Sequence, residues 1–128
     1  MRRFNTLDPL LQSVLVIGIQ VVDFTIVCGY RGKEEQDEAY NNHKSTVQWP
    51  NSKHNVFPSI AVDVAPYYKD FPHLRWNRKY EFVNLHGILI GIAYTKGITL
   101  RSGNNWDRDD ELITDQNFID LPHLELVV

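Results

Sequence analysis

The segment Ile60-Ala61-Val62-Asp63-Val64-Ala65-Pro66 places one carboxylate inside a run that is otherwise apolar. Its β-branched residues and its closing proline predict a strand. Side chains of a strand alternate between two faces, so Asp63 shares a face with the small residues Ala61 and Ala65. A buried carboxylate without a partner costs several kcal/mol, and this position therefore requires a metal ion, an arginine or several hydrogen-bond donors.

Two histidines are candidate partners of this carboxylate. His54 follows the turn-prone Pro50-Asn51-Ser52, and His123 opens a second β-prone run near the C-terminus. Three protein ligands of the His, Asp or Glu type plus one water form the usual coordination sphere of a catalytic zinc ion. The residues are scattered along the chain, however. Residue types alone therefore leave two interpretations open, a metal site or structural histidines beside a solvated aspartate.

The motifs around these residues resemble those of the zinc D-alanyl-D-alanine carboxypeptidase and L-alanyl-D-glutamate endopeptidase family (VanY-like peptidases), which includes many phage endolysins. The shared patterns are Ser-x-His from Ser52, Pro-Ser-x-Ala-x-Asp-x-x-Pro from Pro58, and Asp-x-Pro-His-x-Glu from Asp120. Gly-Tyr-Arg-x-x-x-x-Gln from Gly29 and a Trp-containing loop from Asn105 extend the resemblance over about positions 24 to 128. The best-known form of the motif has a glycine and two fewer residues between the histidine and the aspartate.

The resemblance implies a role for each of several side chains. His54, Asp63 and His123 would hold one catalytic Zn²⁺ ion. Asp120 would act as the general base, and Arg31 would offset charge on the substrate carbonyl. Glu125 shares a strand face with His123, so it is either a hydrogen-bond partner of that ligand or a solvated glutamate.

Two further residues are candidates for substrate binding in this family context. Ser52 either contacts substrate or orients the metal loop, and a simple turn hydrogen bond explains it equally well. Trp106 either contacts substrate or fills the core. The acids of the surrounding loop, Asp107 to Asp110, lack the ligand spacing and the closing glutamate of an EF-hand, so a calcium loop is the less favoured interpretation.

The predicted reaction is hydrolysis of an amide bond in a peptidoglycan stem peptide. The L-alanyl-D-glutamate bond is the first choice, by analogy with short phage enzymes. A D-alanyl-D-alanine carboxypeptidase is one alternative, and a catalytically silent zinc module that binds a wall component or a protein is another. The presence of both Asp120 and Arg31 argues against the silent module.

Composition limits the remaining possibilities. A chain of 128 residues fits one catalytic domain, 1–128, and a net charge of -3 argues against nucleic-acid binding. The single cysteine, Cys28, excludes an internal disulfide and is interpreted as a buried inert thiol. The apolar run 10–22 is interrupted by polar residues and lacks a cleavage pattern, so we expect neither a signal peptide nor a membrane span. A monomer made in the host cytoplasm, which acts on the bacterial wall after release, is therefore expected.

The periodicity predicts an α+β fold with a small, mainly antiparallel sheet and helices packed on one side. Predicted strands cover 24–28, 60–65, 98–102 and 123–127, and predicted helices cover 9–20, 33–42 and 77–95. The resemblance implies the hedgehog/DD-peptidase fold.

Single residues refine this outline. Asp8 is the expected N-cap of the first helix, and Gly97 the residue that ends the last one. In the last helix we interpret His86 as a core or helix-face residue, and Gly87 and Gly91 as permitting close packing on the sheet.

Overall fold

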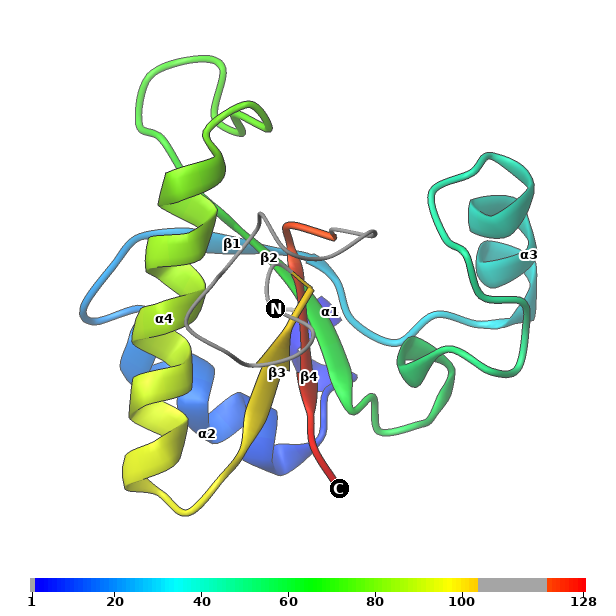
Figure 1. The fold of residues 1–128 in the computed structure, drawn as a ribbon, viewed down its shortest axis with the longest axis horizontal. Helices are drawn as coiled ribbons and strands as arrows, with labels where there is room; N and C mark the ends of the chain where they lie inside the picture. The colour runs from blue at the N-terminus through cyan, green and yellow to red at the C-terminus, as the bar shows by residue number, and fades with distance from the viewer. Residues whose placement is uncertain (1, 104–119) are drawn as a thin grey trace.

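The computed structural model describes residues 2–103 and 120–128 (Figure 1). Along the chain the elements are α1 (Arg2–Asn5), α2 (Pro9–Gly18), β1 (Phe24–Cys28), α3 (Lys33–Asn41), the 3-10 turn η1 (Lys53–Asn55), β2 (Ala61–Pro66), α4 (Lys79–Thr95), β3 (Leu100–Ser102) and β4 (His123–Leu126). The strands form one sheet in the order β1-β2-β4-β3, and each neighbouring pair is antiparallel. The predicted α+β class is confirmed.

Local signals determine where the two long helices begin and end. Asp8 caps α2, because its Oδ1 accepts a hydrogen bond of 2.8 Å from the main-chain nitrogen of Leu10, and Pro9 occupies the first turn. Gly97 follows α4 with a φ of 72°, the left-handed conformation that commonly ends a helix. The short α1 was not predicted, since four residues are too few for a periodic pattern.

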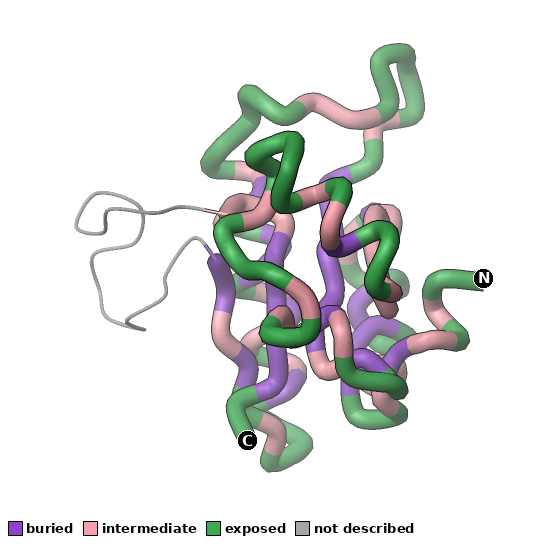
Figure 2. The backbone as a smooth tube through the Cα atoms, turned by 90° about the vertical axis from the view of Figure 1, so that its right-hand side faces the viewer, coloured by how far each residue is buried: buried purple, intermediate pink, exposed green. Residues whose placement is uncertain are grey.

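The hydrophobic core lies between the sheet and the two helices α2 and α4. Both helices are on the left of the sheet in Figure 1, whereas α3 stands away from it on the right. Most of the core side chains come from α2, α4 and the strands, and the cluster comprises Leu7, Leu11, Val14, Leu15, Phe24, Val62, Val64, Leu85, Leu89, Ala93, Leu100, Leu124 and Leu126. Figure 2 shows this buried centre surrounded by exposed loops.

The expectation for Gly87 and Gly91 was wrong. A Cβ atom added at either position would meet no other atom within 4 Å, so neither glycine is needed for packing. The close approach occurs instead at Gly18 of α2, where an added Cβ would collide with the side chain of Leu89 on α4. The close approach at a glycine is thus between two helices, and a side chain at Gly18 would force Leu89 to move.

Strand alternation separates the core face of the sheet from a second, polar face. Because Val62, Val64, Leu124 and Leu126 point into the core, the intervening residues of β2 and β4 point to the opposite face. In the sheet register Asp63 pairs with His123, Cys28 pairs with Asp63, and Arg101 pairs with Glu125. All four strands therefore contribute polar side chains to one surface.

Among the described residues, no helix has both the length and the apolar character that crossing a bilayer requires.

Candidate active site

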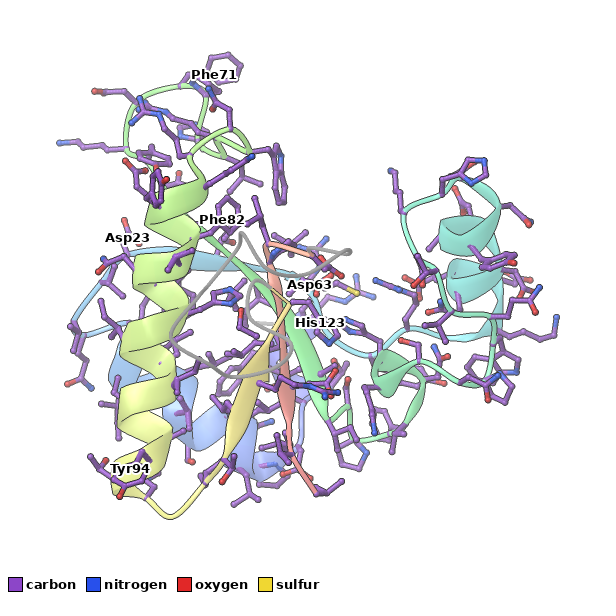
Figure 3. The ribbon with its side chains drawn as sticks, in the orientation of Figure 1. Asp23, Asp63, Phe71, Phe82, Tyr94 and His123 are labelled. Carbon is purple, nitrogen blue, oxygen red and sulfur yellow. The ribbon has the colours of Figure 1, made fainter. Side chains whose placement is uncertain are left out.

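Two imidazoles and one carboxylate converge on a single point of the polar face. His54 Nε2 lies 3.2 Å from Asp63 Oδ1 and 3.3 Å from His123 Nδ1. The third side of the triangle, from His123 Nδ1 to Asp63 Oδ1, is 3.5 Å. Figure 3 shows Asp63 and His123 side by side near the middle of the sheet. The structure thus brings together three side chains that the sequence places far apart.

The size of this triangle suits one small cation. Ligand atoms about 2.0–2.1 Å from a tetrahedral zinc ion lie about 3.3 Å from one another. The three observed separations of 3.2, 3.3 and 3.5 Å are close to that value. One ion could therefore contact all three atoms with little movement of the side chains.

The hydrogen bonds of the two rings agree with this interpretation. His54 Nδ1 lies 2.8 Å from the carbonyl oxygen of Gly29, which can only accept, so this nitrogen carries the proton. His123 Nε2 lies 2.8 Å from Glu125 Oε1. A carboxylate oxygen can only accept, so this ring nitrogen also carries a proton. In the neutral rings the remaining nitrogens then present lone pairs to the centre, where the carboxylate of Asp63 adds a third acceptor.

Electrostatics at the centre favour positive charge. Burial by itself would lower the pKa of His54, but hydrogen bonds to Asp63 and Cys28 outweigh it and raise that pKa to about 10. Burial would raise the pKa of Asp63, yet hydrogen bonds from His123 and His54 hold it well below its usual range. The Asp63 carboxylate is therefore ionised and favours a cation at the centre, either a proton on His54 or a metal ion that displaces that proton.

Short local contacts hold the first histidine. Ser52 caps η1, with its Oγ accepting a hydrogen bond of 3.2 Å from the main-chain nitrogen of His54. Asn55 completes the capping box, since its Oδ1 accepts a hydrogen bond of 3.0 Å from the main-chain nitrogen of Ser52. These contacts account for Ser52 as a residue that orients the loop, and its contact with substrate stays a prediction.

The second histidine is held by a charged pair. Glu125 Oε1 contacts His123 at 2.8 Å, and Glu125 Oε2 accepts from Arg101 Nη2 at 2.8 Å. A carboxylate behind a ligating imidazole fixes the ring and makes it more basic. The predicted contact of Glu125 with His123 is present, but sequence reasoning missed Arg101, which becomes a neighbour only through the β3–β4 register.

Asp120 and Arg31 both lie at the rim of the centre. Burial and the nearby Asp63 carboxylate raise the pKa of Asp120 to about 6. Two hydrogen bonds hold the backbone of Asp120. Its N–H donates to the carbonyl oxygen of Gly103, and its carbonyl oxygen accepts from the N–H of His123. Arg31 Nη2 lies 3.7 Å from Asp63 Oδ2. The site thus has, beside the triangle, a carboxyl group whose pKa is raised to about 6 and a guanidinium cation.

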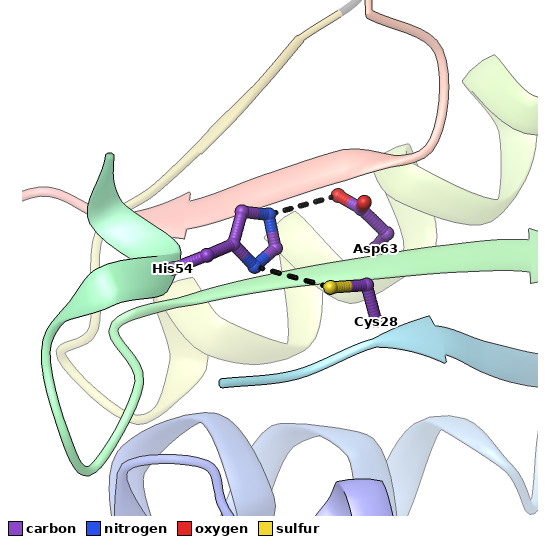
Figure 4. A group of neighbouring side chains, drawn as sticks. All are labelled: Cys28, His54 and Asp63. Atoms are coloured by element: carbon purple, nitrogen blue, oxygen red, sulfur yellow. Dashed lines mark hydrogen bonds and ion pairs between the residues drawn. The ribbon is translucent and has the colours of Figure 1, made fainter. Parts of the chain in front are cut away.

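Cys28 is also next to the site, which the sequence did not indicate. Its thiol is partly exposed and lies 3.9 Å from His54 Nδ1. With His54 and Asp63 it forms a second group of possible metal ligands whose atoms lie within 4.8 Å of one another (Figure 4). We favour the set with His123, because its separations are shorter and because the Nδ1 that faces Cys28 already donates to Gly29.

The remaining predicted site residue, Trp106, lies outside the described residues, as do Asp107 to Asp110. His86 is a buried core residue, and its Nδ1 lies 2.6 Å from Ser102 Oγ.

Two solved structures share this fold. The L-Ala D-Glu endopeptidase ChiX of Serratia marcescens superposes with a TM-score of 0.76 at 20% identity, over 98% of this chain and 84% of that one. The vancomycin resistance D,D-dipeptidase VanXYg, solved with a D-Ala-D-Ala phosphinate analog, gives a TM-score of 0.56 at 19% identity. That match covers 94% of this chain and 50% of the dipeptidase. No curated protein sequence matches the chain.

The family model of the phage L-alanyl-D-glutamate peptidases matches residues 1–127, and the chain belongs to that family. The predicted peptidase class is thereby confirmed, and the protein is a peptidoglycan peptidase of the phage endolysin type that acts on the cell wall.

Proposed function

We propose that the protein hydrolyses the L-alanyl-D-glutamate bond of peptidoglycan stem peptides with one zinc ion held by His54, Asp63 and His123. The observation that carries this proposal is the near-equilateral triangle of ligand atoms, with sides of 3.2, 3.3 and 3.5 Å. The choice of bond rests on the family description and on the name of the Serratia relative. The domain is a monomer that is made in the host cytoplasm and reaches the wall after release.

Each residue at the rim has a task in this reaction. A zinc ion held by the three ligands would lower the pKa of its bound water toward about 7 and would polarise the scissile carbonyl. Asp120 takes the proton of the attacking water and returns it to the leaving amine, for which a pKa of about 6 is well placed. Arg31 offsets the negative charge that develops on the carbonyl oxygen.

Defined muropeptides incubated with the zinc-loaded protein, followed by mass spectrometry of the products, test the proposal. We expect one product that ends in a free L-alanine carboxylate and a second product that begins with a free D-glutamate amine. Release of D-alanine would instead identify a carboxypeptidase, and absence of any product at full zinc loading would identify a silent binding module.

A pair of histidine variants adds the metal control. His123→Ala should lose both zinc and cleavage, whereas His73→Ala, at an exposed loop position, should keep both. Zinc content is measured by atomic absorption after gel filtration. Retention of stoichiometric zinc by His123→Ala would remove that residue from the ligand set.

A further inference from the structure

Helix α3 is mostly polar and exposed to solvent, but it buries the side-chain amide of one of its own residues. Gln36 is the buried residue of this helix, with an exposed fraction of 0%, whereas Tyr40 one turn later is 37% exposed. A glutamine side chain is seldom fully buried, because its amide must then find protein partners for two donors and an acceptor oxygen. The contacts of Gln36 therefore indicate what its burial serves.

The amide of Gln36 uses all of its hydrogen-bonding capacity. Nε2 donates to Ser45 Oγ at 3.0 Å and to the carbonyl oxygen of Val47 at 2.6 Å. Oε1 accepts from Arg31 Nη1 at 3.0 Å and from Asn55 Nδ2 at 3.2 Å. Because a carbonyl oxygen can only accept, the contact with Val47 fixes which end of the amide faces Arg31.

Through this one oxygen, Gln36 connects Arg31 to the loop of the first histidine. Asn55 Nδ2 also donates to the carbonyl oxygen of Arg31 at 2.9 Å, and the main-chain nitrogen of Arg31 donates to the carbonyl of His54 at 2.8 Å. The guanidinium is thus held at Nη1, while its other amino group, Nη2, faces Cys28 Sγ at 3.5 Å and Asp63 Oδ2 at 3.7 Å.

We propose that Gln36 is a positioning residue, whose Oε1 fixes the orientation of the Arg31 guanidinium beside the reaction centre. A planar guanidinium held at one amino group cannot turn both groups toward the Asp63 carboxylate, so the second group stays directed at the site. The kinetic consequence of this anchor rests on the proposed function, because there Arg31 offsets the charge of the transition state.

Gln36→Met removes the anchor while keeping the length and volume of the side chain. If Arg31 acts mainly in the transition state, kcat should fall about tenfold to a hundredfold with KM nearly unchanged and zinc content intact. Gln12→Met is the matched control, because Gln12 Nε2 likewise donates two hydrogen bonds, here to the main-chain carbonyls of Phe4 and Leu7, both at 3.1 Å. We expect it to keep the wild-type kcat. An unchanged kcat in Gln36→Met would overturn the proposal.

A double-mutant cycle tests whether Gln36 acts through Arg31. In an Arg31→Ala background, Gln36→Met should change kcat by less than about twofold, because the anchored group is gone. A full additional loss in that background would show that Gln36 supports the fold or the metal loop instead, and it would overturn the positioning role.

Gln36→Glu separates the anchor from the scaffold. A glutamate keeps acceptor oxygens for Arg31 and Asn55 but loses the donors to Ser45 and Val47. It should therefore be less stable than the wild type yet keep most of its kcat. A drop in kcat as large as that of Gln36→Met, at full zinc loading, would contradict the proposal.

Nitrogen-detected NMR of the Arg31 guanidinium gives a readout independent of cleavage. Distinct Nη1 and Nη2 signals are expected in the wild type, in Gln12→Met and in Gln36→Glu, since rotation is restricted there. Gln36→Met should give one averaged signal, and an averaged signal in the wild type would overturn the proposal. If the wild type cleaves no muropeptide, the proposed function fails, while this comparison still decides the role of Gln36.

Discussion

His54 and His123 each present one ring nitrogen to the centre and use the other nitrogen to hold the ring. The carbonyl of Gly29 holds the first ring, and the carboxylate of Glu125 holds the second. The two supports differ in kind, because a main-chain carbonyl cannot be removed by substitution, whereas Glu125 can. The effect of such a supporting hydrogen bond on its histidine can therefore be measured at His123.

Glu125→Gln should weaken zinc binding about tenfold to a hundredfold, because the amide makes a weaker partner for the His123 ring and for Arg101. Affinity is measured by competition with a chromophoric chelator. Glu38→Gln, at an exposed position of α3, serves as the control and should bind zinc like the wild type. Equal affinities for all three proteins would assign Glu125 a role in stability alone.

Asp120→Asn should keep zinc and lose turnover by about a hundredfold to ten-thousandfold, because the amide cannot take a proton from water. Turnover of a muropeptide and zinc content are measured on the same preparation. Asp37→Asn, whose carboxylate pairs with Lys33 on the surface of α3, should retain full turnover. Wild-type rates in Asp120→Asn would remove Asp120 from the mechanism.

Among the elements, the turn that follows β3 holds the candidate base close to the candidate metal ligands. Gly103 donates to the carbonyl of His123 at 2.8 Å, and its own carbonyl accepts from Asp120 at 2.9 Å. A Cβ atom added at Gly103 would collide with the carbonyl oxygen of Asp120. The contact between the two chain segments therefore requires a residue without a side chain.

Gly103→Ala should push Asp120 away from the centre and lower kcat at least tenfold, since small misplacements of reacting groups are costly. Gly87→Ala is the matched control, because an added Cβ there meets no atom within 4 Å. That helix variant should keep its kcat and gain about 0.5–1 kcal/mol of stability. A normal kcat in Gly103→Ala would mean that the turn can relax.

Most elements could be predicted, because strand alternation and helix caps are local signals. The ends of β1 and the start of α2 agree with the prediction, and α4 begins two residues later than predicted. The side-chain contacts of Gln36 and Cys28 could not be predicted, because they depend on which segments meet in space. The Gly-Tyr-Arg-x-x-x-x-Gln pattern marked Gln36, but nothing in the pattern shows that its amide is buried beside Arg31.

Over the whole molecule, a buried histidine links stability to pH. Burial lowers the pKa of His86 to about 4, against about 6.5 in an unfolded chain. The unfolded state therefore binds a proton that the folded state refuses, and stability is lost as the pH falls from about 6.5 toward 4. The full difference corresponds to about 3 kcal/mol.

Urea unfolding at pH 7.5 and pH 4.5 measures this linkage. The wild type should lose about 2–3 kcal/mol more than His86→Gln between the two values. Comparing the two proteins isolates His86, since other groups titrate in both. Equal losses in the wild type and the variant would show that His86 does not control acid stability.

The sheet order β1-β2-β4-β3 places the last strand of the described chain between two strands made before it. A nascent polypeptide that has reached residue 103 already carries His54 and Asp63, but β3 still lacks the neighbour that joins it to β2. Translation of β4 therefore supplies His123, the last member of the triangle, together with the strand that completes the sheet. If His123 is a zinc ligand, a chain that ends before it cannot cleave peptidoglycan, and activity arises together with the completed sheet.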